Sequence, residues 1–160
     1  MNSSDLQNLS EAERRARVAE ALARGEELRK AKEYDKGIDV LVEALRYGVE
    51  KAKIYFRLGN IYFDAGKLDH AEYAYRRAID CDPNHVNAHH NLSVVLRKQG
   101  RLSESVRLYR QAQRLAMKYP DQVQLSPEQT EQARRLARRW LIVAGIVLGV
   151  FVLVLVLWGR

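Results

Sequence analysis

Cysteine and proline are scarce in this chain. Cys81 is the single cysteine, so a disulfide framework is excluded and a reducing compartment is expected. Only three prolines occur in 160 residues, so little interrupts long helices. Ala, Leu, Glu, Arg and Lys are abundant instead, and this composition is typical of an all-α protein.

The sequence motifs of catalysis are also missing. The chain has no phosphate-binding glycine loop, no dinucleotide fingerprint and no zinc-protease signature. His85 and His89 are four residues apart, but no cysteine or carboxylate completes a metal-ligand set around them. We interpret His89 as a packing residue, and Cys81 as a half-buried one. We therefore expect neither an enzyme nor a cofactor or metal site.

The net charge of +7 raises the question of nucleic acid binding. Residues 1–119 contain 22 basic and 17 acidic side chains, and the two kinds are interleaved. A stripe of stacking aromatic residues and arginines, which single-stranded nucleic acid requires, is absent. We expect no nucleic-acid partner.

The last part of the chain is one long apolar run. The nineteen residues from Trp140 to Trp158 contain no charged or strongly polar side chain, and as a helix they span roughly 28 Å, the thickness of a bilayer core. The two tryptophans suit the headgroup level on either side. Four arginines between 134 and 139 keep residues 1–139 in the cytoplasm by the positive-inside rule. We predict a single-pass transmembrane helix over 140–158, in a bacterial inner membrane or on the cytosolic face of an organelle.

Two glycines in this apolar run have a spacing that favours helix association. Gly145 and Gly149 are four residues apart, so they lie on one face of the predicted transmembrane helix. Small residues at this spacing let two helices approach closely. A homodimer through the anchor is therefore one expected partnership, beside the membrane lipid itself.

A fixed period of thirty-four residues runs through the region before the anchor. Residues 66–69, Gly-Lys-Leu-Asp, recur at 100–103 as Gly-Arg-Leu-Ser, and the same shift relates Tyr75 to Tyr109. Such a period in a helical composition predicts a stacked array of helix–turn–helix units. We place the units at residues 18–51, 52–85 and 86–119.

The middle unit shows which kind of helical array this is. It contains, in this order, Tyr55, Leu58, Gly59, Tyr62, Ala71, Tyr75, Ala78 and Pro83. This series resembles the pattern of the tetratricopeptide repeat family, which has an aromatic residue, Leu-Gly, an aromatic residue, Ala, an aromatic residue, Ala and Pro at set spacings. The resemblance implies an all-α fold, a right-handed superhelical array of three helix–turn–helix units. The first unit departs most from the pattern, as is expected of a terminal repeat.

Small and large residues alternate in these units for a physical reason. Gly59 is small where two helices must approach closely, and Tyr75 and Tyr109 are large partners that fill the space between helices. Gly66 and Gly100 stand where a helix ends and the backbone needs a positive φ.

The repeats are flanked by segments of different character. Residues 1–10 lack periodicity and are expected to be a disordered tail, and a Ser-Glu-Ala-Glu capping box then starts a helix at Glu11. The repeat domain extends over 11–119, and Pro127 prevents a fourth unit in register. We predict a linker and a basic juxtamembrane helix over 120–139. Whether that helix packs on the last repeat or forms a free stalk stays open.

The resemblance also implies where a partner binds. The first helix of each unit lines the concave side of a tetratricopeptide array, and the cations and two phenylalanines expected there suit an acidic and apolar peptide. The family's clamp for a chaperone's C-terminal carboxylate is not expected, because its positions carry the wrong residues here. The expected groove residues are Arg29, Lys30, Lys53, Phe56, Asn60, Phe63, Asp64, Asn87, His90, Val94, Arg97 and Lys98.

These observations together predict a function in assembly. We expect a membrane-anchored adaptor or scaffold that binds protein partners through the concave groove on the cytoplasmic side. The alternative is a structural subunit or assembly factor of a membrane protein complex.

Overall fold

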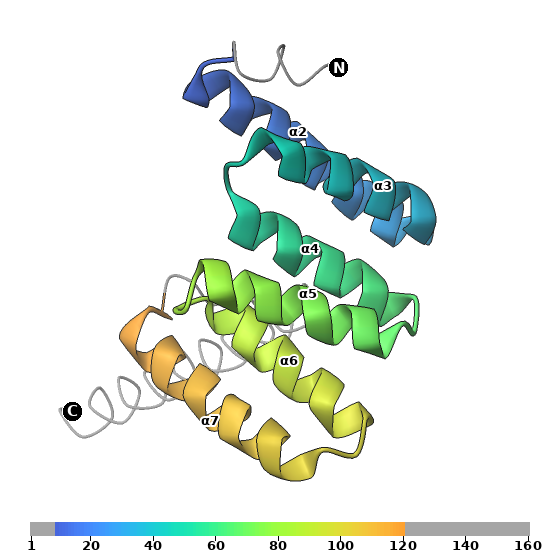
Figure 1. Ribbon diagram of the computed structural model, residues 1–160. Coiled ribbons are helices and arrows are strands. Elements are labelled where there is room, and N and C mark those ends of the chain that lie inside the picture. Colours follow the sequence, from blue (N-terminus) through green and yellow to red (C-terminus); the bar gives the residue numbers. More distant parts are fainter. Residues whose placement is uncertain (1–8, 121–160) are drawn as a thin grey trace, which may run out of the picture. The chain divides into compact units, whose positions relative to one another are not determined.

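The computed structural model describes residues 9–120, and all regular structure within that range is helical. Six α-helices and one 3₁₀-helix occur there, without a strand. Figure 1 shows them in succession from the N-terminal side to the last helix. The helices are α2 (Glu11–Lys30), α3 (Tyr34–Ala44), η1 (Leu45–Tyr47), α4 (Lys51–Asp64), α5 (Leu68–Cys81), α6 (Val86–Lys98) and α7 (Leu102–Lys118).

Several predictions concern residues outside this range. The tail over 1–8, the basic helix within 120–139 and the predicted span with Trp140, Gly145, Gly149 and Trp158 lie outside the described residues. Between Leu9 and Pro120, none of the helices combines the length and the apolar character that crossing a bilayer requires.

The helices pair into three antiparallel hairpins. α2 packs on α3, α4 on α5 and α6 on α7, while α3 contacts α4 and α5 contacts α6 to join one hairpin to the next. Each predicted repeat unit contains most of one hairpin, although α2 begins at Glu11, before the first unit at 18–51.

The ends of the helices follow the predicted local chemistry. α2 begins at Glu11 behind a capping box, in which the Ser10 hydroxyl accepts from the Glu13 backbone N–H and the Glu13 carboxylate accepts from the Ser10 backbone N–H at 2.8 Å. Gly66 and Gly100 follow α4 and α6 with φ of 75° and 81°, in the left-handed region that favours glycine.

The core forms where the hairpins face one another. Tyr75 on α5 is 1% exposed, and Gly59 on α4 leaves room for its ring. A Cβ atom at Gly59 would lie 2.5 Å from the Tyr75 ring, closer than atoms can pack. The predicted close approach of small and large residues is therefore confirmed in the middle unit.

Two packing predictions are wrong. Tyr109, at the position equivalent to Tyr75, is 45% exposed because α7 is the last described helix and no further hairpin within that range covers its outer face. Cys81 is exposed rather than half-buried, because it is the last residue of α5.

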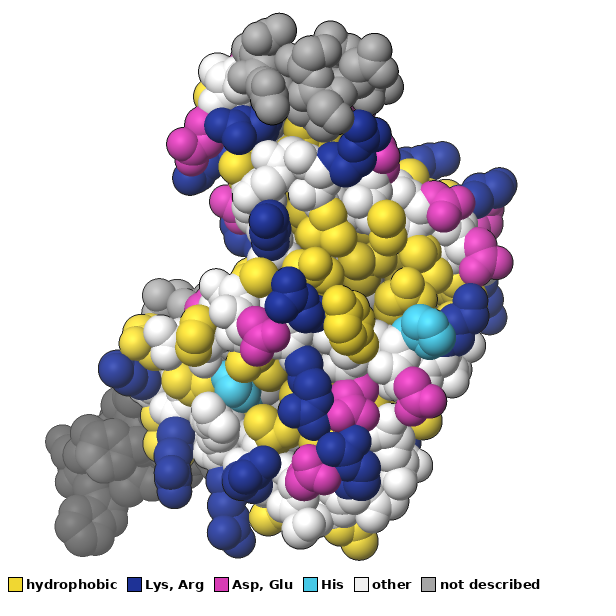
Figure 2. Space-filling view, viewed as in Figure 1, with side chains coloured by type: hydrophobic (Ala, Val, Ile, Leu, Met, Phe, Trp, Pro, Cys, Tyr) yellow, Lys and Arg dark blue, Asp and Glu magenta, His cyan; other side chains and the backbone are white. Residues whose placement is uncertain are grey.

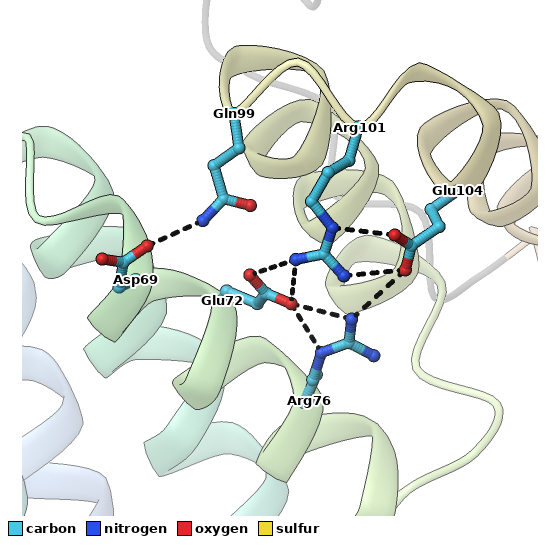
Figure 3. A network of polar contacts seen from close by, with 6 residues as sticks. All are labelled: Asp69, Glu72, Arg76, Gln99, Arg101 and Glu104. Atoms are coloured by element: carbon cyan, nitrogen blue, oxygen red, sulfur yellow. Dashed lines mark hydrogen bonds and ion pairs between the residues drawn. The ribbon is translucent and has the colours of Figure 1, made fainter.

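A network of charged side chains ties the second hairpin to the third, as Figure 3 shows. Arg101, between α6 and α7, binds Glu72 of α5 and Glu104 of α7, each at 2.8 Å. Burial raises the pKa of Glu72, but the hydrogen bonds from Arg76 and Arg101 outweigh that effect and hold it below its ordinary value. This network fixes α7 against the α4/α5 hairpin by charge as well as by packing.

Candidate peptide-binding groove

A cavity of about 250 Å³ lies among the first helices of the three units. Arg29 comes from the end of α2, and Asn60, Phe63 and Asp64 from the second half of α4. The other walls are Tyr75 of α5 and the pair Asn91 and Val94 of α6. The cavity depends on the stacking of all three hairpins, because each contributes at least one side chain.

The polar floor of the cavity is a cluster of three side chains. The Tyr75 hydroxyl donates to Asn60 Oδ1 at 2.8 Å, and Asn91 Nδ2 donates to the same oxygen at 3.1 Å. Burial raises the pKa of Tyr75 well above its ordinary value, so the hydroxyl keeps its proton and stays a donor. Asn60 Nδ2 and Asn91 Oδ1 have no hydrogen-bond partner within the described residues. This donor and this acceptor match the two hydrogen-bonding groups of a peptide bond.

Charge at one end of the cavity is largely balanced. Arg29 binds Glu26 through two hydrogen bonds of 2.8 and 3.0 Å and also pairs with Asp64 across the α2–α4 boundary. The hydrogen bond to Glu26 is the main reason that the pKa of Arg29 is raised, and the Arg29 hydrogen bond likewise lowers the pKa of Glu26. Arg29 therefore serves to join α2 to α4 and has little charge left for a ligand.

The predicted groove residues fall into two groups. Arg29, Asn60, Phe63, Asp64 and Val94 line the cavity. Lys98 lies over the Phe63 ring, with its ammonium nitrogen 5.1 Å from the ring centre. The remaining predicted residues do not line this cavity: Lys30, Lys53, Phe56, Asn87, His90 and Arg97.

The structure explains some of these differences. Phe56 was expected on the groove surface, but it is only 6% exposed because it packs against Tyr75 and against the ring of His85. That prediction is therefore wrong, and Phe63 is the phenylalanine that the cavity exposes. Lys53 pairs with Glu50 at 2.6 Å.

Sequence reasoning missed two residues of the cavity. Tyr75 was assigned to packing alone, although its hydroxyl reaches the floor. Asn91 was not selected, although it stands three residues before Val94 and hence on the same face of α6. That helical spacing from a predicted groove residue is the signal that could have identified it.

His85 and His89 both have structural contacts. His89 is 2% exposed, and its Nε2 lies 2.9 Å from the Pro83 carbonyl oxygen. His85 caps α6, with Nδ1 accepting from the Ala88 backbone N–H. Within residues 9–120, no three His, Cys, Asp or Glu side chains are grouped so that they could hold a metal ion.

Comparison with known families agrees with this architecture. Two family models, both described as tetratricopeptide repeat, match residues 52–85 and 74–107. Over residues 52–107 the chain thus matches tetratricopeptide repeats, and such repeats indicate a scaffold for protein–protein interaction. No curated protein matches the sequence.

Several solved structures share the fold, among them structures of MamA. A MamA crystal structure is 25% identical with a TM-score of 0.57, and the match covers 61% of this chain and 57% of that one. MamA from Desulfovibrio magneticus RS-1 is 22% identical with a TM-score of 0.56, over 63% and 57% of the two chains. The match thus spans a little over half the length of these MamA chains.

Proposed function

We propose that this protein is a membrane-anchored adaptor that captures a segment of a protein partner in the cavity between α2, α4 and α6, and that it acts by binding rather than by catalysis. The observation that supports this proposal is the floor of that cavity. There, Asn60 and Asn91 leave a donor and an acceptor without a protein partner, beside the apolar walls Phe63 and Val94. Convergent polar groups beside apolar side chains are what a binding site needs to fix the orientation of its ligand.

The chemistry of the cavity suggests the kind of segment that it takes. An extended peptide can place one peptide bond against the two asparagines and an apolar side chain between Phe63 and Val94. Lys98 lies above Phe63 and forms no ion pair with a carboxylate within the described residues, so it favours an acidic side chain next to the apolar one. An acidic and apolar peptide therefore suits the groove.

The anchor is the second part of the proposal. The run from Trp140 to Trp158 and the arginines before it support a single-pass tail anchor with the repeats on the cytoplasmic side. The pair Gly145 and Gly149 supports self-association of that helix. Extraction of membranes with alkaline carbonate tests the anchor: the full chain should stay with the lipid, and release into the supernatant would refute it.

A double substitution tests the groove. Asn91→Ala removes a donor and acceptor without depriving Tyr75 of its Asn60 partner, and Lys98→Glu reverses the charge above Phe63. The matched control, Tyr73→Ala with Lys36→Glu, changes an exposed aromatic residue and one positive charge on α5 and α3. Partners purified with the full chain in mild detergent should be lost with the groove variant and kept with the control.

The alternative function is a structural subunit of a membrane complex. The specific observation in its favour is apolar surface on the second helices, where Val42 of α3 is 48% exposed and Tyr73 of α5 is 61% exposed. A built-in subunit should lose its partners with the Tyr73→Ala control and keep them with the groove variant. The same purification therefore separates the two functions.

A further inference from the structure

The last described helix carries an exposed apolar stripe. Leu102 is 60% exposed, Val106 48%, Tyr109 45% and Met117 85%. Their separations of four, three and eight residues place all four along one side of α7. Tyr109 also stacks against His90 of α6 at 5.9 Å between ring centres, so the stripe continues onto the neighbouring helix.

A basic stripe runs beside the apolar one. Arg107, Arg110, Arg114 and Lys118 follow each other at separations of four and three residues, and all are exposed. No acidic residue occurs between Ser105 and Lys118. Figure 2 shows dark blue and yellow side chains side by side over α7.

Several cations outside α7 are held by carboxylates. Arg29, Arg76 and Arg101 each bind one or more carboxylates. Arg110 and Arg114 form no ion pair with a carboxylate in the described part of the chain. The Arg101 hydrogen bond is the main reason that the pKa of Glu104 is lowered, and Arg107 adds to this only through its charge, without an ion pair. The three arginines of α7 are therefore accessible to an external anion.

We propose that the α7 surface, defined by Leu102, Val106, Tyr109 and Met117 with Arg107, Arg110, Arg114 and Lys118, lies against an anionic lipid bilayer. Apolar side chains beside a basic stripe are the features by which a helix binds in the plane of a membrane interface. The apolar residues enter the boundary between headgroups and acyl chains, and the cations pair with lipid phosphates. This contact goes beyond anchoring and peptide capture, because it holds the repeat domain itself against the surface.

Charge and position favour lipid over an acidic protein as the occupant. From Ser105 to Lys118 the helix carries cations and no acidic residue, and this basic stripe beside exposed apolar side chains matches an anionic headgroup layer with an apolar interior beneath it. Only residues 119–139 separate α7 from the apolar run that begins at Trp140. If that run is inserted in a membrane, this length of chain allows α7 to touch the same membrane.

A fluorescent label on α7 tests the contact in the full chain. With Cys81→Ser to remove the exposed native thiol, Met117→Cys carries a polarity-sensitive dye, and Val42→Cys on α3 carries the same dye as a position control. The protein is reconstituted into phosphatidylcholine vesicles with or without phosphatidylglycerol. The dye at 117 should shift to the blue and be quenched by nitroxide lipid in anionic vesicles only, while the dye at 42 should not respond.

A charge variant measures the electrostatic part. Replacing Arg107, Arg110 and Arg114 by Gln should lower the ratio of lipid-contacting to free α7 by roughly 100-fold, since each cation near an anionic surface contributes about fivefold. The control replaces Arg17, Lys32 and Lys51, three exposed cations elsewhere, by Gln and changes the net charge equally. It should leave the response at 117 unchanged, and circular dichroism should show that both variants remain helical.

Three results would overturn the proposal. In the first, the dye at 117 stays in water on anionic vesicles. In the second, the dye is shielded before any lipid is added, which would mean that another part of the protein covers α7. In the third, the dye responds to an acidic protein or a nucleic acid and not to lipid. Carbonate extraction of the same samples reports the tail anchor independently of the dye. Failure of the anchor and failure of the α7 contact are therefore separate observations.

Discussion

The second helices of the middle and last hairpins, α5 and α7, show how the same repeat position can have two different environments. Tyr75 and Tyr109 are thirty-four residues apart and occupy equivalent positions, but the first is 1% exposed and the second 45%. α5 is covered by α6, whereas no described helix lies beyond α7. A repeat motif thus specifies a hairpin and the size of its residues, while burial depends on what stacks next.

The first and largest predicted effect comes from removing the side chains of these two tyrosines, whose exposed fractions differ most. Tyr75→Ala should lower the free energy of unfolding by about 3–5 kcal/mol, because it empties a buried ring site and removes one of the two donors to Asn60 Oδ1. Tyr109→Ala should cost less than about 1 kcal/mol, because its ring is half in solvent. Urea unfolding of the full chain in mild detergent measures both, and equal losses would contradict the assignment of α7 as an uncovered helix.

The second prediction concerns the small residues that face these tyrosines. Gly59→Ala should cost about 1–3 kcal/mol, because its methyl group would meet the Tyr75 ring at 2.5 Å. Ser93, the equivalent residue of the next unit, already has a side chain, which donates to the His90 carbonyl at 2.6 Å. Ser93→Ala should therefore cost only about 1 kcal/mol, the worth of one hydrogen bond. The same unfolding curves check the order, and a harmless Gly59→Ala would disprove the close approach of α4 and α5.

The third and smallest predicted effect is a pH dependence of the stability at His85, between the second hairpin and the third. Burial lowers the pKa of His85 below its ordinary value of 6.5, so the folded protein binds a proton there less readily than the unfolded chain. Asp82 opposes this shift, while Arg57 and His89 add to it. Stability should thus be complete above pH 6.5 and decline as the pH falls below that value, levelling off below the folded pKa.

A matched pair of histidine variants isolates this effect. His85→Asn keeps a capping oxygen for the Ala88 N–H but cannot titrate, so it should flatten the decline. His90→Asn, at an exposed position, should leave it unchanged. Unfolding is measured between pH 7 and pH 5, above the range in which carboxylates such as Glu26 and Glu72 take up protons. A decline that persists in His85→Asn would assign the effect to another group.

The groove shows how far the sequence alone could be taken. The resemblance to tetratricopeptide repeats predicted that Asn60, Phe63 and Val94 face one groove, and the structure places all three at the cavity. The same reasoning placed Phe56 on the surface, since a one-dimensional pattern cannot show that Tyr75 and His85 close over that ring. It also counted Arg29 and Lys53 as free cations, although each has a carboxylate partner that only the stacked helices or a neighbouring turn reveal.

The sequence by itself determined the period, the helical hairpins, the capping box at Ser10 and the glycines that end α4 and α6. These features depend on interactions within one turn of helix or between neighbouring helices of one unit, so the local pattern is sufficient. Only the tertiary structure decided which cations are neutralised, which tyrosine is buried and which side chains meet around the cavity. Those outcomes depend on contacts between residues some thirty positions apart, such as Asn60 with Asn91 and Glu72 with Arg101, and distance along the chain does not reveal them.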